Sequence, residues 1–526
     1  MSENYDIVSI GSGHNGLVAA AYMAAAGKKV LVLERNEWFG GGVVTAELTG
    51  PGYLHDRFST GHIFIQGNPL IKNDELKLLS RFGLKYLYPD VPFLCAFEDG
   101  STIALHRDRN RTYQEIAKFS KKDADAFLKF AETAMRYLPM MSASLYTPPI
   151  PLGAMFAMLD QSAEGRELFA YMQKSPYDII SESFENEKVQ MFFTRMVGEN
   201  LTGPEEKGTG VGIFVFLGFM EQYGIGVAVG GSGSLTASLV RCIEAHGGKV
   251  LNRTSVDQVV VKNGRAVGVS ANGAEYAAKD GVIGAIHPHL LRRLVPGVDE
   301  KVARAAERVE VSANSCFTVH AALNEPLRFK AGPHVNQAYF TELMPASMTI
   351  LREYFDALRY GRMPDTSLLG LVSPSTFDAT RCPPGKATLH VWDYVPYSHP
   401  DGGPSHWDQA KDAFSQTMLS RMKPYIDNIT PENIIEYVAD SPLDIERASA
   451  SFQKGDVHGV APYLYQSGAH RPTPDLGHNT VPGVDRLYLV GPFQHPGGGV
   501  FGAGRATAMK MCEDMKIDFD KIGRGR

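Results

Sequence analysis

The stretch "YDIVSIGSGHNGLVAAAYMAAAGKKVLVLERN", residues 5–36, decides the fold of this protein. Its apolar start ends in a turn that holds Gly11, Gly13 and Gly16, and an alanine-rich segment follows. Such a turn lets a pyrophosphate approach the backbone, and the amino terminus of the next helix offers free N–H groups and the positive end of its dipole. The stretch therefore predicts a strand–turn–helix unit that binds a dinucleotide.

The flanking residues set the limits of this unit. We expect a buried strand at 7–10, a helix from about 15 to 26 that ends at Gly27, and a second parallel strand over "KKVLVLE". Glu34 stands at the end of that strand, where an acidic side chain meets the hydroxyl pair of a ribose. A carboxylate there disfavours a 2′-phosphate, so the pattern indicates FAD or NAD rather than NADP.

Two further glycine loops favour FAD. Residues 40–42 are all glycine and follow the second strand directly, which is typical of flavoproteins in which FAD lies extended; a flexible turn is the alternative. The second loop lies in "DRLYLVGPFQHPGGGVFGAGRATAMKMCED", residues 485–514. There we expect a strand at 487–490, a glycine loop, and a segment at 500–511 that leads into a helix. A loop–helix junction of this kind can offer N–H groups to the flavin end.

Together these signatures resemble the phytoene desaturase and carotenoid oxidoreductase group of FAD flavoproteins, and most of all the branch named for a pyridine nucleotide-disulphide oxidoreductase domain. Residues 227–250, "GDVHG" at 455–459 and residues 465–475 are similar to family segments as well. After the first of these segments, the pairs Asn263-Gly264 and Asn272-Gly273 predict the turns of a β-meander.

The resemblance implies FAD as the cofactor and an α/β fold. We expect a discontinuous Rossmann-type FAD-binding domain, glutathione reductase-like or amine oxidase-like, formed by residues 1–88, 227–290 and 455–526. Residues 89–226 and 291–454 are expected to form an inserted α+β substrate domain, with a helical stretch at 112–137. The residues expected to contact FAD are Gly11, Gly13, His14, Asn15, Gly16, Glu34, Arg35, Gly41, Gly42, Ser59, Thr60, Gly61, Val256, Gly491, Pro492, Gly498, Gly499 and Val500.

Three histidines are candidates for catalysis: His495, His62 and His55. His495 precedes the second glycine loop, and the other two belong to "GYLHDRFSTGHIF", which resembles the family segment beside the isoalloxazine ring. A packing or structural role is the alternative for each of them, and also for His320. The "HPH" at 287–289 lacks partners at ligand spacing, so we predict no metal site.

Composition excludes several classes of protein. The chain has 526 residues, a formal net charge of −6 and no cluster of Lys and Arg, which gives no support for nucleic-acid binding. Its five cysteines lie far apart, which suits a reducing compartment, and a strand that begins by Tyr5 leaves no room for a cleavable signal, so we expect a cytoplasmic protein. The apolar segment 138–159 contains four prolines, which exclude a continuous membrane-spanning helix. We expect it to form a buried hairpin or loop, or to rest on a membrane surface.

The leading functional hypothesis is an FAD-dependent dehydrogenase or oxidase that removes hydride from a largely apolar, polyene- or isoprenoid-like small molecule. We find no second Rossmann unit and no CxxxxC pair, so reduced flavin is expected to pass electrons to oxygen, a quinone or another acceptor. The alternatives are a flavin-dependent isomerase or saturase, an oxidase of a small amine or alcohol, and a non-enzymatic escort protein for prenylated partners. Contact with a membrane and homo-oligomer formation are left open.

Overall fold

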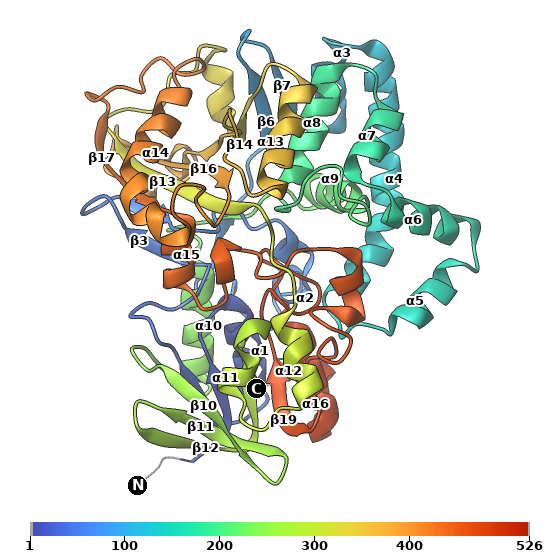
Figure 1. The fold of residues 1–526 in the computed structure, drawn as a ribbon, viewed down its shortest axis with the longest axis vertical. Helices are drawn as coiled ribbons and strands as arrows, with labels where there is room; N and C mark the ends of the chain where they lie inside the picture. Colours follow the sequence, from blue (N-terminus) through green and yellow to red (C-terminus); the bar gives the residue numbers. More distant parts are fainter. Residues whose placement is uncertain (1–3, 524–526) are drawn as a thin grey trace.

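The computed structural model describes residues 4–523, which form two large sheets and two two-stranded ones, with helices around them (Figure 1). The eight-stranded sheet consists, in spatial order, of β10 (Val256–Lys262), β11 (Arg265–Ala271), β19 (Val484–Leu489), β12 (Ala274–Gly284), β1 (Tyr5–Ile10), β2 (Val30–Leu33) and β9 (Lys249–Leu251), with β18 (Thr480–Val481) paired to β19. The pairs β1–β2, β1–β12, β2–β9 and β12–β19 are parallel. This is the Rossmann-type sheet that the amino-terminal stretch predicts.

Helix α1 (His14–Ala25) follows β1 through the glycine turn, as predicted, and Gly27 has a φ of 85° just after the helix. The predicted carboxyl-terminal strand is β19, and the helix after it is α16 (Gly504–Met515), which begins four residues later than Val500. The meander is confirmed too, because both Asn-Gly turns between β10, β11 and β12 have positive φ at each of their two central residues.

The seven-stranded sheet consists, in spatial order, of β17 (Ile434–Asp440), β13 (Ser315–Leu323), β16 (Ala387–Val395), β15 (Gly370–Val372), β14 (Ala338–Met344), β6 (Val91–Phe97) and β7 (Thr102–Leu105). The side chains of successive residues in β13 point to opposite faces of the sheet. Phe317 packs on the rings of Trp407 and Phe414 in α14 (Trp407–Arg421), whereas Cys316 and Thr318 face the cavity described below.

A group of helices lies beside this sheet, on its other side (Figure 1). They are α3 (Arg109–Ala117), α4 (Lys121–Leu145), α5 (Leu152–Leu159), α6 (Ala163–Gln173), α7 (Pro176–Ser183), α8 (Glu187–Gly198), α9 (Gly212–Gln222) and α13 (Met348–Arg359). The single helical stretch predicted at 112–137 is divided in two, because the Ser120 side chain accepts a hydrogen bond from the backbone N–H of Asp123 and starts α4 there.

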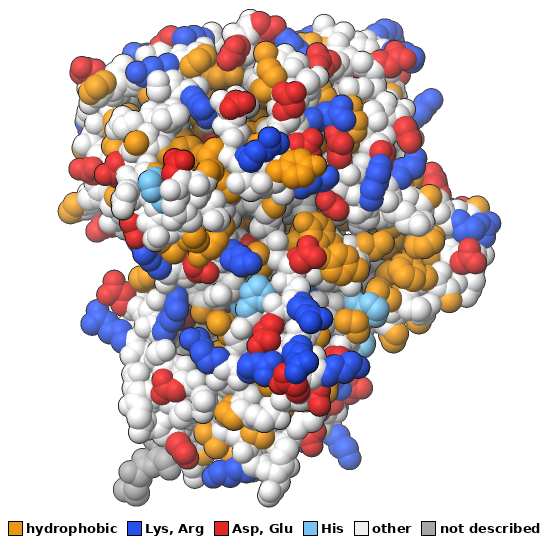
Figure 2. Space-filling model, viewed as in Figure 1, with side chains coloured by type: hydrophobic (Ala, Val, Ile, Leu, Met, Phe, Trp, Pro, Cys, Tyr) orange, Lys and Arg blue, Asp and Glu red, His pale blue; other side chains and the backbone are white. Residues whose placement is uncertain are grey.

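The apolar segment 138–159 differs from the expected buried hairpin or loop. Its first part completes α4, its proline-rich middle is a loop, and its end is α5, which projects from the body with α6 (Figure 1). Met140, Ile150 and Met158 are exposed, Met158 by 63%, and hydrophobic side chains gather on this part of the surface (Figure 2). Among residues 4–523, no helix is both long and apolar enough to cross a membrane.

Further elements belong to neither of the two large sheets. They are β3 (Thr45–Glu47), β4 (Leu54–Asp56), α2 (Pro69–Lys72), β5 (Tyr86–Leu87), β8 (Val227–Ala228), α10 (Gly233–Ala245), α11 (Leu291–Leu294), α12 (Glu300–Glu307) and α15 (Pro442–Ala448). The strands of each sheet come from the segments expected for the two domains. Helices α11 and α12, which we assigned to the substrate domain, pack their apolar side chains against the eight-stranded sheet instead. The exact domain boundaries stay a prediction.

The crossing of α1 and α16 gives a test of the fold. A Cβ atom on Gly504 would lie 1.9 Å from the carbonyl oxygen of Asn15 and 2.6 Å from the amide nitrogen of Ala19. We therefore expect Gly504→Ala to force the helices apart and to lower the free energy of unfolding by about 1–3 kcal/mol. Thermal unfolding of the two proteins measures this change.

The matched control is Gly153→Ala in α5. A Cβ atom there would meet nothing within 4 Å, so this substitution is expected to be neutral or to stabilise by up to about 1 kcal/mol through helix propensity. Equal melting temperatures for the two variants would contradict the close helix crossing.

Candidate active site

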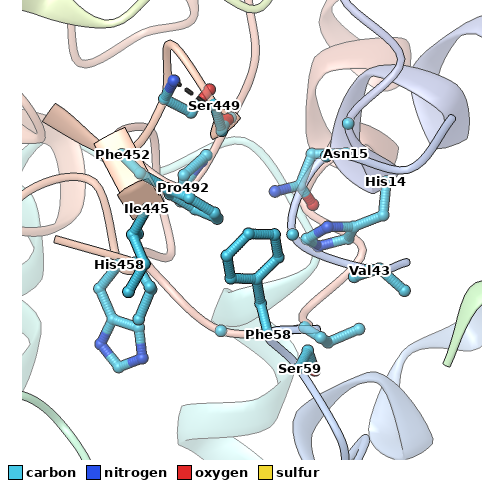
Figure 3. A pocket seen from close by; sticks show the side chains of 18 of the residues that line it. His14, Asn15, Val43, Phe58, Ser59, Ile445, Ser449, Phe452, His458 and Pro492 are labelled. Carbon is cyan, nitrogen blue, oxygen red and sulfur yellow. Dashed lines mark hydrogen bonds between the residues drawn. The ribbon is translucent and has the colours of Figure 1, made fainter. Parts of the chain in front are cut away.

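One cavity connects the glycine loops of the eight-stranded sheet with the inner face of the seven-stranded sheet (Figure 3). All the residues expected to contact FAD line this cavity except Gly498. At Gly498 a Cβ atom would lie 2.3 Å from the Cβ of His458, so the glycine packs against that side chain. The structure thus brings together three glycine loops that are far apart in the sequence, while the contacts of the single residues with FAD stay a prediction.

The part of the cavity beside α1 suits the ADP half of a dinucleotide. Among residues 4–523 no side chain caps α1, and its first turn carries no acidic residue, so its N–H groups and dipole remain available to a phosphate. A Cβ atom on Gly13 would meet nothing within 4 Å, which leaves open space in front of these groups. His14 adds a buried Nε2 without a hydrogen-bond partner among the described residues, and burial lowers the pKa of this histidine to about 3.

Glu34 occupies the position expected of a ribose-binding carboxylate. It is buried after β2, and its Oε2 accepts hydrogen bonds from the backbone N–H of Ser12 (2.9 Å) and from the Ser12 hydroxyl (2.7 Å). Its Oε1 accepts a hydrogen bond from the backbone N–H of Asn36 at 2.9 Å. These bonds fix the carboxylate at the edge of the cavity beside the first glycine loop.

Side chains from outside the carboxyl-terminal glycine loop hold it in place. The Asn15 side chain accepts a hydrogen bond from the backbone N–H of Ala503 at 2.8 Å. The buried guanidinium of Arg471 donates to the carbonyl oxygens of Pro492 (2.7 Å) and Val460 (2.9 Å), and burial lowers its pKa to about 10. The loop therefore presents its backbone to the cavity in a fixed shape.

The far half of the cavity has mainly apolar walls. Figure 3 shows Phe58 pointing into its middle, and the rings of Phe58 and Phe452 lie edge to face with centroids 5.3 Å apart. The other large apolar residues that line this half are Ile63, Phe64, Phe93, Leu201, Phe216, Met220, Phe340, Trp392, Ile445 and Val457. An apolar molecule would bury most of its surface here.

Two polar residues of this half, Glu199 and His458, were not predicted from the sequence. Glu199 directly follows α8 and accepts hydrogen bonds from the Tyr394 hydroxyl (3.1 Å) and the Trp392 indole N–H (3.4 Å). His458 is hydrogen-bonded to the backbone of Asn200, and burial lowers its pKa, which favours the neutral imidazole. His458 belongs to the "GDVHG" landmark, which is a signal for it, whereas no sequence signal marks Glu199.

The three candidate catalytic histidines are buried but do not line the cavity. Burial lowers the pKa of each to about 4, and each has a hydrogen bond to a neighbouring group. These contacts are His495 Nε2 to the carbonyl oxygen of Ser144 (2.8 Å), His62 Nδ1 to the Tyr86 hydroxyl (2.8 Å) and His55 Nε2 to the Thr49 hydroxyl (2.7 Å). Their catalytic use stays a prediction that this geometry does not support.

A histidine pair that was not predicted from the sequence lies at the surface. His399, Asp401 and His406 place one potential ligand atom each within 4.8 Å of one another, at the start of the segment that leads into α14. In the "HPH" at 287–289, the Nε2 of His287 is instead hydrogen-bonded to the carbonyl oxygen of Gly459 at 2.7 Å. Neither group lines the cavity, and the absence of a metal site stays a prediction.

The comparison with protein families agrees with this geometry. Residues 16–407 match the model of the family described as flavin containing amine oxidoreductase. The chain belongs to this family and is an FAD-dependent oxidoreductase.

Similar proteins span almost the whole chain. One of the subunits of limonene dehydrogenase from Castellaniella defragrans is 25% identical, over 98% of this chain and 95% of its own length. The mouse pyridine nucleotide-disulfide oxidoreductase domain-containing protein 2 is 27% identical over 98% and 94%, and the lycopene-forming phytoene desaturase of Pseudescherichia vulneris is 26% identical over 97% and 99%. The resemblance seen in the glycine motifs is confirmed.

Solved structures share the fold. An oxidoreductase from Methanosarcina mazei superposes with a TM-score of 0.61 at 16% identity, covering 96% of this chain and 99% of that one. Cyclohexylamine oxidase from Brevibacterium oxydans has a TM-score of 0.57 at 16% identity, covering 98% of this chain and all of that one. The predicted amine oxidase-like architecture is therefore confirmed.

Glu34 provides a test of the FAD site. We expect Glu34→Ala to weaken FAD binding by about 10-fold to 100-fold, because the ribose hydroxyls lose a charged acceptor. The control is Glu37→Ala, which removes an exposed carboxylate that pairs with Arg253 on the surface. Equilibrium dialysis of FAD against both apoproteins measures the change, and equal affinities would show that Glu34 does not hold the ribose.

Proposed function

We propose that this FAD-dependent enzyme removes hydride from a largely apolar small molecule and that its reduced flavin then passes electrons to oxygen, a quinone or another acceptor. The observation that carries the proposal is the continuity of the cavity, whose apolar far half opens directly on the glycine loops. The names of two relatives, limonene dehydrogenase and phytoene desaturase, support an apolar substrate.

Removing two hydrogens from neighbouring carbons requires a hydride acceptor and a proton acceptor. Bound FAD supplies the hydride acceptor. For the proton we propose His458, because its ring lines the cavity, is neutral, and packs against Gly498 of the loop expected at the flavin end. The hydrogen bond to the Asn200 backbone orients the ring and leaves its other nitrogen to accept a proton.

Two alternatives keep the same cofactor. A flavin-dependent isomerase or saturase would use the same apolar compartment and would differ in substrate and in the redox state of the flavin. An oxidase of a small amine or alcohol would need a compact polar pocket, whereas most of the far half of this cavity is apolar. Contact with a membrane, homo-oligomer formation and a cytoplasmic location stay predictions.

The first experiment is an anaerobic visible spectrum of the FAD-loaded enzyme before and after addition of limonene, phytoene or cyclohexylamine, each in turn. We expect at least one of the two hydrocarbons to bleach the flavin band, even where it binds weakly, and the amine to leave the band unchanged. Bleaching by cyclohexylamine alone would overturn the apolar substrate and favour the amine oxidase. An oxidised flavin that converts a hydrocarbon to its isomer without bleaching would favour the isomerase.

A second experiment tests the proton acceptor. We expect His458→Gln to slow flavin reduction by about 100-fold or more, because the amide cannot take up a proton. His495→Gln is the matched control, since that ring is buried and lies outside the cavity lining. Stopped-flow absorbance with the substrate that bleaches the flavin gives both rates, and a similar loss in both variants would contradict the assignment.

A further inference from the structure

A buried ionic cluster stands against the apolar half of the cavity. Arg195 of α8 is fully buried, and its Nη2 lies 2.6 Å from the Oε2 of Glu342 in β14, which is also fully buried. Its Nη1 donates to the Oε1 of Glu199. One guanidinium thus contacts two carboxylates, and of these two only that of Glu199 belongs to the cavity lining.

One oxygen of Glu199 is left for a ligand. The bonds from Arg195, Trp392 and Tyr394 all end on its Oε1, and its Oε2 has no hydrogen-bond partner among residues 4–523. The side chain is 25% exposed, while every group that donates to it is buried. Three donors therefore hold the carboxylate still, with a free acceptor oxygen in a compartment of mainly apolar walls.

The charge of the cluster decides what kind of donor suits this oxygen. Burial raises the pKa of Glu342 well above its usual value despite its contact with Arg195, which favours the protonated acid. The remaining positive charge of Arg195 is then balanced by Glu199. A neutral donor, such as a hydroxyl group, completes the cluster without adding a charge to a buried site, whereas an ammonium would leave an excess positive charge.

The floor of the cavity supports a polar group on the substrate. Thr318 is the register partner of Trp392 across β13 and β16, and His390 comes two residues before Trp392 on the same face. Both are only 5% exposed, line the cavity, and have hydroxyl or ring nitrogen atoms without a hydrogen-bond partner among the described residues. A polar strip thus runs along the floor from Glu199, and a plain hydrocarbon would cover it without satisfying it.

We propose that the substrate is a mainly apolar molecule that carries a hydroxyl group, and that Glu199 Oε2 accepts the hydrogen bond of this hydroxyl. The proposal rests on the proposed function, of which it specifies the substrate class. Glu199 then acts as a substrate-binding residue that fixes one end of the molecule, while the apolar walls hold the rest.

Calorimetric titration of the FAD-loaded enzyme with decane, 1-decanol and decylamine tests the proposal, because these probes share one chain and differ only in the head group. We expect 1-decanol to bind about 10-fold to 100-fold more tightly than decane, since a hydrogen bond to a charged group is among the strong ones. In Glu199→Leu this preference should vanish. In Glu199→Gln the preference should also fall, because the amide oxygen takes the three donors and an NH2 group, which donates and does not accept, replaces Oε2.

Three outcomes would overturn the proposal: equal affinities of the wild type for decane and 1-decanol, an unchanged preference in Glu199→Leu, or tightest binding of decylamine that both variants abolish. The last would identify an ammonium-binding site instead. The wild-type comparison needs no variant, so it decides the case even where a variant does not fold. Glu205→Leu is the control, since Glu205 pairs with Arg352 outside the cavity.

Failure here is distinguishable from failure of the proposed function. If an apolar substrate bleaches the flavin but decane and 1-decanol bind with equal affinity, only the proposal of a hydroxyl group on the substrate is contradicted. If no apolar substrate bleaches the flavin, the proposed function itself is contradicted.

Discussion

The close crossing of α1 on α16 is the constraint on which the rest of the site depends. Asn15 bonds to the backbone N–H of Ala503, 488 residues further along the chain, and Gly504 has no space for a Cβ atom. Since α1 starts at one glycine loop and α16 follows another, this contact sets the distance between the two loops. A cofactor that extends from one to the other needs that distance to be fixed before it binds.

The features that were predicted well from the sequence are those that depend only on neighbouring residues. The turn at Gly11 and Gly13 and the Asn-Gly turns of the meander each follow from the backbone freedom of a few neighbouring residues, and the structure forms them where expected. The break between α3 and α4 is local as well. Ser120 is a helix cap of the usual kind, but the mixed apolar pattern around it concealed the signal.

The far half of the cavity could not be predicted, because it is assembled by tertiary packing. The carboxylate of Glu199 is held by hydrogen bonds from Trp392 and Tyr394, which lie almost two hundred residues away. The register of β16 places these two residues. His495 shows the converse case. It precedes a glycine loop that lines the cavity, yet its own ring points to Ser144, because neighbours in sequence on an irregular loop need not face the same way.

Strand β13 shows why such a site leaves so weak a trace in the sequence. All nine of its residues are buried, so the usual alternation between buried and exposed positions is absent. One face packs on α14 and the other lines the cavity with Cys316 and Thr318, of which Thr318 is the polar residue that reveals this second face. Burying polar groups without partners costs free energy, so on a strand buried on both sides they are better explained by a ligand than by packing. A polar residue at alternate positions of an otherwise apolar buried strand is thus the sequence signal that points to the substrate rather than to the core.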